Sequence, residues 1–490
     1  MKHTNKMRVS ALFLAAVMLA FSACAKTSAS AGAPVQLDAK NPVSLRMWHY
    51  YNGLQKSALD EMVAEFNDSV GSQQGIVVEA FSHGSIADLT ENVLDAVHKK
   101  VGAEQVPEIF AAYADTAYQV DQLNMVADLS PYITQEELAA YVPGYIAEGR
   151  LGNAAEFKIF PVAKSTEIMM LNKTDWTVFA DETGAKLEDL ATMEGLVAVA
   201  KTYYEWTDAK TPTPNDGKAF WGRDSMANYF IIGAKQLGVV LFDVKDDVVT
   251  FHLDKAVLRT LWDNYYVPSV EGWFGAYGRF RSDDAKTGDI LALVGSSSGA
   301  AYFPDSVTIS DTESYPIEAL SLPAPRFRNG EKVAVQQGAG MVVTKSTPQK
   351  EYAASIFLKW MTEEARNINF SISSGYLPVK TAANDSAKIA QAIQTMAADE
   401  SVRKLATSMP VAIETVLQNE LYTNTAFAHG FEARNLLEHS LSDKLKQDLT
   451  QIDAQMQTGV LRSEAAAQYE TDENFDAWYE SFSAALYALQ

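Results

Sequence analysis

The stretch from residue 43 to residue 125 opens with "VSLRMW" (43–48) and contains two further short apolar runs, "IVVEAF" (76–81) and "EIFAAY" (108–113). Between and after these runs, apolar residues recur at spacings of three and four. That spacing predicts amphipathic helices at about 56–70, 86–99 and 115–125. Strands that alternate with helices in this order indicate a mainly parallel sheet with helices on both faces.

A second region with the same alternation begins near residue 160. Strands are expected at "KIFPVA" (158–163), "EIMMLN" (167–172), "ALSLPA" (319–324) and "AVQQGAGMVVT" (334–344). Helices are expected at 187–206, 224–238 and 254–267 and over the last 60 residues. The best-marked helix start is Thr347-Pro348, since threonine can cap a helix and proline suits its first position. The chain therefore holds two α/β regions.

The composition limits the classes of function. The chain has 490 residues, of which 47% are apolar, so a large core is available. Its formal net charge is −22. A strongly acidic chain is a poor candidate for binding nucleic acid, which needs a basic surface. No nucleic-acid partner is expected.

The N-terminus has the layout of a secretory signal. Three cations, Lys2, Lys6 and Arg8, precede the apolar run "ALFLAAVMLAF" (11–21), and small residues follow. This order predicts a signal peptide over residues 1–23 and a location outside the cytoplasm. The only cysteine, Cys24, comes next. It is either an unpaired thiol or a lipid attachment point.

The residues before Cys24 favour lipidation. "LAFSAC" (19–24) resembles the lipobox of bacterial lipoproteins, although Phe21 replaces the leucine usually found three positions before the cysteine. The following "AKTSASAGAP" (25–34) is rich in small and polar residues, a composition typical of a flexible tether. We therefore expect a lipidated cysteine and tether over residues 24–42, anchored to a membrane.

Motifs of enzymes and metal sites are missing from the sequence. There is no GxSxG, GxxxxGK[ST] or HExxH segment, and the seven histidines form no spaced cluster. The segment "LVGSSSGAAYF" (293–303) is more typical of a turn whose hydroxyls offer hydrogen bonds than of a serine nucleophile, because no His/Asp partner can be named. The sequence predicts no catalytic residue, no metal site and no cofactor.

Several segments together resemble the extracellular solute-binding proteins of ABC transporters, in the branch that binds oligosaccharides and glycerol phosphate. The strongest is "QQGAGMVVTKSTPQKEYAASIFLKWMTEEARNINFSISSGYLPVKTAA" (336–383), similar to that family's glycine-containing strand, proline-capped helix and "GYLPV" loop. "FPVAKSTEIMMLNKTDW" (160–176) is similar to its first crossover segment, and "VPEIFAAYA" (106–114) and "VGSSSGAAYF" (294–303) match shorter pieces. The resemblance covers about residues 43–490.

The resemblance implies a two-lobed α/β fold of the periplasmic-binding-protein type. Each lobe is expected to contain a mainly parallel sheet flanked by helices, and crossing hinge strands should join the lobes. By analogy, lobe one would hold residues 43–163 and 303–345, and lobe two residues 164–302 and 346–490. Ligand would bind in the cleft between them and stabilise the closed state, which then docks on a membrane permease.

Candidate ligand contacts follow from strand ends and from the resemblance. His49, Tyr50 and Asn52 come directly after the expected end of the first strand at Trp48, where ligands of open α/β sheets bind. Aromatic rings suit the apolar faces of sugars, and polar tips suit their hydroxyls. The resemblance adds residues of matching segments: Ser165, Thr166, Trp221, Ser297, Ser298, Gly338, Gly340 and Tyr376. Turn capping is the alternative for Ser165 and Thr166, and close strand packing is the alternative for the two glycines. Trp221 is expected in a loop after "TPTPNDGKA" (211–219), and Tyr376 is expected in the cleft, where its removal should spare the fold.

The ligand class is inferred from one segment in which this chain departs from the pattern of the family. Family members that bind glycerol phosphate place an arginine in a "Met-Arg-Leu-Gly-Asn"-like segment, whereas this chain reads "LYTNTAFAHGFEARN" (421–435), with Arg434 several residues late. Arginine favours bidentate phosphate binding, so a neutral saccharide is preferred over a glycerol-phosphate-type ligand. The expected protein is a monomer that delivers carbohydrate to ABC permease subunits. A protein that serves a sensor and a secreted glycan hydrolase are the other hypotheses.

Overall fold

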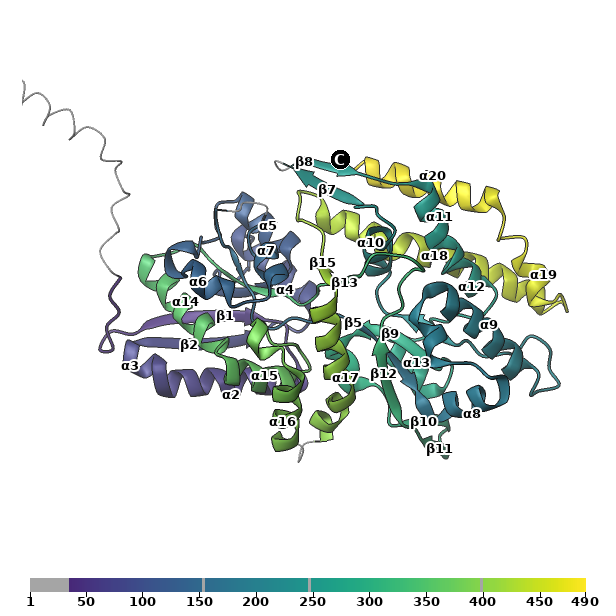
Figure 1. Cartoon of the computed structure of the whole chain (residues 1–490). Helices are drawn as coiled ribbons and strands as arrows, with labels where there is room; N and C mark the ends of the chain where they lie inside the picture. The colour runs from purple at the N-terminus through teal and green to yellow at the C-terminus, as the bar shows by residue number, and fades with distance from the viewer. Residues whose placement is uncertain (1–34, 152–154, 246–247, 397–399) are drawn as a thin grey trace, which may run out of the picture.

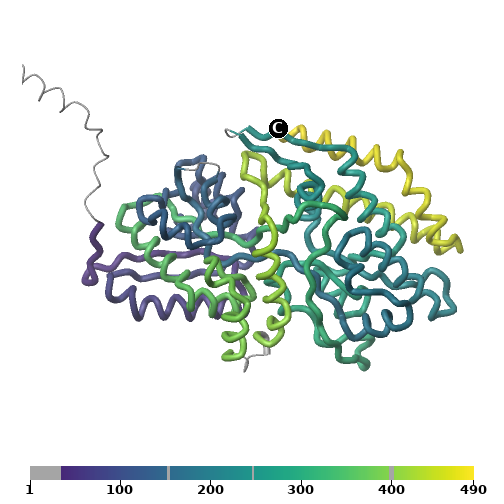
Figure 2. Tube along the Cα trace, viewed as in Figure 1, coloured from purple at the N-terminus to yellow at the C-terminus, as the bar shows by residue number. Residues whose placement is uncertain are grey.

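The computed structural model describes residues 35–151, 155–245, 248–396 and 400–490. Two sheets lie side by side, each surrounded by helices (Figure 1), and the chain passes between them more than once (Figure 2). This arrangement confirms the predicted two-lobed α/β class. The expected signal peptide and Cys24 lie outside the described residues, as does most of the expected tether.

Sheet one has the strand order β2-β1-β3-β14-β4, and β14 is antiparallel to both of its neighbours while β1 is parallel to β2 and β3. Sheet two has the order β12-β5-β9-β6, and β5 is antiparallel to β12 and β9 while β6 is parallel to β9. The strands of sheet one are β1 (Val43–His49), β2 (Ile76–Ser82), β3 (Ile109–Ala112), β4 (Ile159–Phe160) and β14 (Gly340–Val343). Those of sheet two are β5 (Glu167–Asn172), β6 (Trp221–Arg223), β9 (Ala292–Ser296) and β12 (Ala319–Pro323).

One reversed strand in each sheet marks where the chain enters that lobe. Residues 161–166 lead from β4 into β5, and residues 336–339 lead from β13 (Val333–Val335) into β14. Since β5 and β14 start at these connections, they begin at the edge where the other strands of their sheets end. The carboxyl ends of the parallel strands therefore face the region between the lobes, as the rule for open α/β sheets predicts.

Helices cover both sheets. Around sheet one lie α2 (Gly53–Phe66), α3 (Ser72–Gln74), α4 (Ile86–Val97), α5 (Ala114–Gln122), α6 (Gln135–Ala139), α7 (Pro143–Glu148), α14 (Pro348–Met361), α15 (Glu364–Ser374) and α16 (Ser386–Met396). Around sheet two lie α8 (Lys173–Thr183), α9 (Met193–Asp208), α10 (Met226–Gln236), α11 (Lys255–Asp263), α12 (Tyr266–Val270), α13 (Arg281–Thr287), α18 (Gly430–Met456), α19 (Arg462–Ala466) and α20 (Asp472–Tyr487). The helix α17 (Glu400–Gln418) runs between the two groups (Figure 1).

Three small two-stranded sheets complete the fold. They pair β7 (Phe242–Lys245) with β8 (Val248–Phe251), β10 (Ser306–Ser310) with β11 (Glu313–Pro316), and β13 (Val333–Val335) with β15 (Glu420–Tyr422). The last pair is parallel and joins two segments far apart in the sequence. It lies where the chain leaves α17 and where it leads into residues 336–339.

The start of α14 shows why the sequence is helical there. The Thr347 hydroxyl accepts a hydrogen bond from the Lys350 amide at 3.3 Å, and Pro348 occupies the first helical position. The cap satisfies an amide that has no partner within the helix, and proline has none to satisfy. The predicted start of this helix is confirmed.

The expected lobe boundaries are wrong in two segments. Residues 303–335 were expected in lobe one, but within this segment β12 pairs with β5 from Ala319↔Asn172 to Pro323↔Ile168, which places it in sheet two. Residues 348–396 were expected in lobe two, but α14 packs on sheet one, where Phe357 and Trp360 contact Phe66 of α2 at ring-centroid distances of 4.9 and 5.2 Å. The chain returns to lobe one at residues 336–339 and leaves it for the second time through α17.

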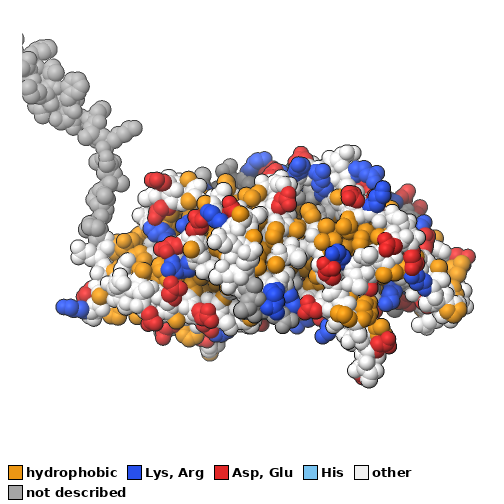
Figure 3. Space-filling model, turned by 60° about the horizontal axis from the view of Figure 1, so that its bottom comes forward, with side chains coloured by type: hydrophobic (Ala, Val, Ile, Leu, Met, Phe, Trp, Pro, Cys, Tyr) orange, Lys and Arg blue, Asp and Glu red, His pale blue; other side chains and the backbone are white. Residues whose placement is uncertain are grey.

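In this structure, lobe one comprises residues 43–160 and 340–396, and lobe two comprises residues 167–335 and 420–490. There are two apolar cores: one lies in lobe one and continues onto sheet two, with Ile168, Met170 and Leu293, and the other lies in lobe two and is rich in rings, with Trp262 stacked on Tyr266 at 3.7 Å. On the face shown in Figure 3, acidic and basic side chains are interspersed. Among the described helices, none combines the length and the apolar character needed to cross a membrane.

Candidate functional site

Two of the predicted tyrosines meet between the lobes. The hydroxyl oxygens of Tyr50 and Tyr376 lie 3.1 Å apart. Tyr376 follows Gly375, whose φ of +77° ends α15 in the left-handed conformation that suits glycine. A Cβ on Gly375 would lie 2.9 Å from the carbonyl oxygen of Ser298, so lobe two also approaches closely here. The structure thus brings together Tyr50, Tyr376 and Ser298.

These phenols remain neutral. Burial raises the pKa of Tyr376, with the neighbouring Tyr51 adding to the rise and hydrogen bonds from Tyr50 and Ser298 opposing it. Burial likewise raises the pKa of Tyr50. Tyr376 is only 5% exposed, and its ring centroid lies 5.8 Å from that of Tyr51. It is therefore partly a core residue, more enclosed than the sequence predicts.

The hydroxyl residues of the first crossover tie the connecting segments to each other. Ser165 and Gln337 exchange two backbone hydrogen bonds, of 3.0 and 2.9 Å. The Thr166 hydroxyl donates to the Val335 carbonyl at 2.8 Å, and the Ser297 hydroxyl accepts from the Thr166 amide at 3.3 Å. Ser165, Thr166 and Ser297 are all buried. The hydrogen bonds of Thr166 and Ser297 are therefore explained by a structural role within the chain, which is the alternative to contact with a ligand.

The two predicted glycines permit close packing of strands. Gly338 has a φ of +91°, and a Cβ there would lie 2.9 Å from the Ala163 carbonyl oxygen. A Cβ on Gly340 would lie 2.3 Å from Cγ2 of Ile159 on the neighbouring strand β4. At both positions a side chain would collide with neighbouring atoms of the chain itself, so close packing explains the glycines without a ligand.

Two predicted contact residues are in the core. Trp221 is 0% exposed and forms an edge-on contact with Phe274 at a centroid distance of 4.7 Å. It was expected in a loop, but it is the first residue of β6, so its ring points into the core of lobe two. His49 is the last residue of β1 rather than the first beyond it, and it is fully buried. Its Nδ1 accepts from the Tyr51 amide, and burial lowers its pKa to about 4.

Asn52 stays exposed, but its side chain is occupied. Its amide donates to the Tyr50 carbonyl at 3.0 Å and also to the Gly84 carbonyl. These bonds join the loop after β1 to the loop after β2. Asn52 thus holds Tyr50 in place rather than reaching towards lobe two.

Three further residues of this region were not predicted as ligand contacts, although the sequence analysis named Arg434 when it weighed a phosphate ligand. Tyr113 directly follows β3, and 42% of its surface is exposed. Asp115 lies in the first turn of α5 and abuts Gly430 at the start of α18, where a Cβ would lie 2.4 Å from the Asp115 Oδ1. Arg434 lies one turn into α18 and acts electrostatically on both Tyr113 and Asp115. The rule that ligands bind at strand ends, applied to "EIFAAY", could have found Tyr113. Asp115 and Arg434 come together only when α18 packs on α5 in the folded chain.

We call Tyr50, Tyr113, Asp115, Ser298, Tyr376 and Arg434 the interlobe cluster. It is positioned by two buried ion pairs. In the first, the Lys164 ammonium pairs with Glu148 and also donates to the Gly338 carbonyl at 2.7 Å. In the second, Arg223 pairs with Glu167 at 2.8 Å. The Glu167 carboxylate also accepts from Asn228, which in turn accepts from Arg434 at 2.6 Å.

The interlobe cluster offers aromatic rings and hydrogen-bonding groups, but it contains no nucleophile paired with a general base. No group of three or more His, Cys, Asp or Glu side chains that could hold a metal is found among the described residues. The arrangement suits recognition of a solute with apolar faces and hydroxyls.

Residues 61–398 match the family of bacterial extracellular solute-binding proteins. The chain belongs to this family. As a member, it is a solute-binding component of ABC transport and not an enzyme, as the sequence predicts. Family membership removes the hypothesis of a secreted glycan hydrolase. No curated protein sequence matches the chain.

Solved structures similar to this solute-binding protein share its fold over most of the chain. The cyclic α-maltosyl-1,6-maltose binding protein of Arthrobacter globiformis is 19% identical with a TM-score of 0.61, covering 91% of this chain and 99% of that one. UgpB from Mycobacterium tuberculosis, in complex with glycerophosphocholine, is 15% identical with a TM-score of 0.62, covering 92% and 100%. The maltose/maltodextrin-binding domain MalE of Bdellovibrio bacteriovorus, bound to maltotriose, is 13% identical with a TM-score of 0.57, covering 90% and 99%.

The carboxyl group of Asp115 makes the stability of this solute-binding protein depend on pH. Burial raises its pKa from 3.8 to about 6; Arg434 opposes the rise, and Glu148 and Glu432 add to it. Its Oδ1 has no hydrogen-bond partner among the described residues. A raised acid pKa means that the folded state binds a proton more tightly than the unfolded chain, so the penalty is fully present above pH 6 and absent well below pH 4.

We expect Asp115→Asn to raise the free energy of unfolding at pH 7.5 by up to about 3 kcal/mol, since two pKa units correspond to that amount. At pH 4 the gain should shrink towards zero. Urea unfolding of the wild type and the variant at both pH values measures the difference. Asp181→Asn, an exposed position on α8, is the control and should change little at either pH. An equal effect of Asp115→Asn at both pH values would contradict the raised pKa.

Proposed function

We propose that the protein captures a neutral saccharide between its lobes and delivers it to the membrane subunits of an ABC importer. The observation that supports this most is the interlobe cluster. Three tyrosines, at positions 50, 113 and 376, gather near the carboxyl ends of β1 and β3, opposite the hydroxyl of Ser298. Aromatic rings that stack on sugar faces and neutral phenols that share hydrogen bonds with hydroxyls suit an uncharged carbohydrate.

Binding would act through closure. A solute that contacts both lobes is bound more tightly by the closed state than by the open one, and that difference in affinity shifts the population towards closure. The approach of Asp115 to Gly430 shows that α5 and α18 can meet directly. Gly430 permits this approach because any side chain there would collide with the carboxylate.

A glycerol-phosphate-type ligand is the second candidate, and the position of Arg434 favours it. The sequence argument against phosphate rested on this arginine lying several residues late. In the structure, Arg434 nevertheless acts on Tyr113 and Asp115 between the lobes. One of its nitrogens is held by Asn228, and the nearby Asp115 and Glu148 would repel a phosphate when ionised. The neutral saccharide therefore remains the first proposal.

Tyr113 should contact the ligand directly. Because 42% of its surface is exposed, Tyr113→Ala is expected to weaken binding about 10- to 100-fold by removing a stacking ring, with less than about 1 kcal/mol of change in apo stability. Calorimetry with a saccharide identified in a thermal-shift panel measures the affinity, and denaturant unfolding measures the stability.

The control for Tyr113 is Tyr277→Ala, an exposed tyrosine of lobe two outside the interlobe cluster. It should leave the affinity unchanged. Equal affinities of wild type and Tyr113→Ala would place the ligand elsewhere.

The proposed cellular arrangement is a monomer anchored outside the cytoplasm through lipid on Cys24. Cys24 is the sole cysteine and follows the predicted signal peptide. We expect Cys24→Ser to move the protein from the membrane fraction to the soluble fraction, while its ligand affinity stays the same. Retention of the variant on membranes after a high-salt wash would contradict the lipid anchor.

Loss of uptake of the saccharide in a strain lacking the protein would distinguish transport from a sensing role.

A further inference from the structure

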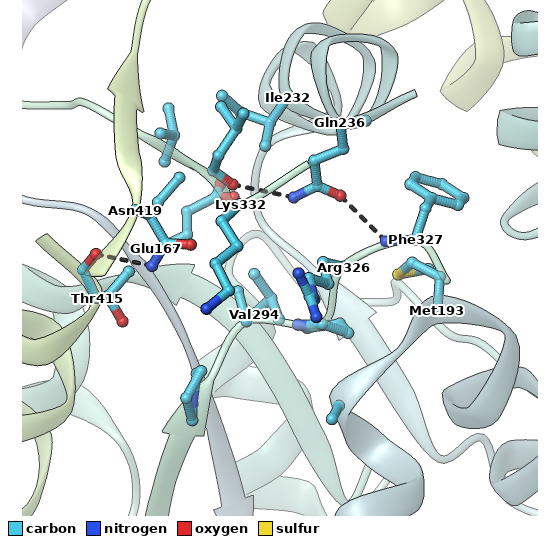
Figure 4. A pocket seen from close by; sticks show the side chains of 18 of the residues that line it. Glu167, Met193, Ile232, Gln236, Val294, Arg326, Phe327, Lys332, Thr415 and Asn419 are labelled. Carbon is cyan, nitrogen blue, oxygen red and sulfur yellow. Dashed lines mark hydrogen bonds between the residues drawn. The ribbon is translucent and has the colours of Figure 1, made fainter. Parts of the chain in front are cut away.

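A hollow lies in lobe two, beside the connection between the lobes. It has a volume of about 340 Å³ and is bounded by α10, the loop 323–327, the strand β13 and the C-terminal end of α17. Lys332 and Arg326, both on the connection between β12 and β13, line it (Figure 4). Tyr50, Tyr113 and Tyr376 do not line it. This volume is within the range of small-molecule sites.

Three cations gather at this hollow in a protein of net charge −22: Arg223, Arg326 and Lys332. No ion pair joins Arg326 or Lys332 to a carboxylate among the described residues, and the guanidinium of Arg326 makes a single hydrogen bond to them, of 3.4 Å to the Gly330 carbonyl. At physiological ionic strength, charges more than about 8 Å away in solvent are largely screened, so these local cations outweigh the distant acidic surface.

The acidic residues of the hollow are already engaged. Both carboxylate oxygens of Glu167 accept hydrogen bonds, one from Arg223 and one from Asn228. Glu414 lies at the exposed rim and accepts from Gln418 at 2.6 Å. Arg223 is buried and uses Nε and Nη2, whereas its Nη1 has no hydrogen-bond acceptor among the described residues. Arg326 and Lys332 are therefore the two cations of the hollow that no described carboxylate pairs, whereas the charge of Arg223 is paired with Glu167.

Apolar side chains form most of the remaining wall, including Leu190, Met193, Ile232, Val294 and Phe327. The wall is held in shape without a ligand. The buried Gln236 donates to the Val333 carbonyl at 3.0 Å and accepts from the Phe327 amide at 3.1 Å, so it joins α10 to two other sides of the hollow. On the fourth side, Asn419 donates to the Thr415 carbonyl at 2.8 Å.

We propose that this hollow is a binding site for a small organic acid. Its carboxylate would pair with Lys332 and Arg326 and its apolar body would lie against Ile232, Met193 and Phe327. An inorganic anion would gain nothing from the apolar wall, and a neutral molecule of the same shape would leave the cations unpaired. The hollow adjoins the interlobe cluster through Asn228, which lines it and accepts a hydrogen bond from Arg434, but none of the three cluster tyrosines lines it.

Calorimetry on the full-length protein with acetate, hexanoate, benzoate, benzamide and inorganic phosphate tests the proposal. Hexanoate or benzoate should bind at least about 10-fold more tightly than acetate, because each buried methylene adds to affinity. Benzamide, which has the shape of benzoate without its charge, should bind at least about 10-fold more weakly than benzoate. Phosphate should not compete. The variant Arg326→Gln/Lys332→Gln should weaken binding of the acid roughly 10- to 100-fold, since hydrogen bonds to charged groups are lost.

The control variant is Arg328→Gln/Lys245→Gln, which removes the same charge at exposed positions that do not line the hollow. It should bind the acid as the wild type does. Four results would overturn the proposal: no binding of any acid, binding of phosphate alone, equal binding of benzamide and benzoate, or equal losses in the two double variants.

Discussion

Lys164→Met is expected to lower the free energy of unfolding by about 3–5 kcal/mol, because it leaves the Glu148 carboxylate buried without its cation. Lys164 is one of the largest fully buried side chains, and its ammonium joins Glu148 of α7 to the Gly338 carbonyl of the second connecting segment. Gln336 donates to the same carboxylate at 2.6 Å but carries no charge to replace the ammonium. Denaturant unfolding with two independent probes measures the loss.

The double variant Lys164→Met/Glu148→Gln should recover much of this stability, since replacing both partners removes the unpaired charge. The matched control is Lys56→Met, which breaks an exposed ion pair with Asp60 and should cost less than about 1 kcal/mol. If Lys164→Met costs as little as Lys56→Met, the pair does not hold the connecting segments.

Tyr376→Ala is expected to lower the free energy of unfolding by about 3–5 kcal/mol and to weaken ligand binding at least about 10-fold. The ring is 5% exposed and packs beside Tyr51 and Tyr50, so its loss opens a cavity in the core. The sequence predicts a ring in the cleft whose removal spares the fold, and the observed burial changes that expectation. Chemical unfolding and calorimetry on the same preparation give both quantities.

Tyr376→Phe separates the two roles of this residue. It keeps the ring and removes only the hydroxyl that meets Tyr50, so it should cost about 1 kcal/mol of stability. If the hydroxyl also meets the ligand, affinity should fall while the fold survives. A Tyr376→Ala protein as stable as the wild type would contradict the packing described here.

Local patterns predicted the elements well because they depend on neighbouring residues. The three strands of "VSLRMW", "IVVEAF" and "EIFAAY" form as β1, β2 and β3 in parallel, and Thr347-Pro348 begins α14. The assignment of elements to lobes depended on pairings across the chain, and there the sequence failed. Nothing in "ALSLPA" indicates that it pairs with β5, a strand about 150 residues earlier, rather than with sheet one.

The site residues were predicted less well than the helices and strands, because an error of one residue in the end of a strand decides whether a side chain faces the core. His49 is the last residue of β1 instead of the first beyond it, and Trp221 begins β6 instead of lying in a loop. Tyr50 was predicted from the end of a strand, which is a local feature, and Tyr376 from the resemblance of its "GYLPV" loop to the family, and the ligand contact of both stays a prediction. Arg434 and Asp115 meet through the packing of α18 on α5, which no local pattern reports.

Calorimetric titration of the wild-type protein with a panel of neutral oligosaccharides and glycerophosphodiesters tests the proposed function most directly. We expect at least one neutral oligosaccharide to bind with a Kd of about 1 μM or tighter, a free energy of about −8 kcal/mol, and glycerophosphocholine to bind much more weakly. Tight binding of glycerophosphocholine with no binding of any saccharide would contradict the account and assign Arg434 to the phosphate.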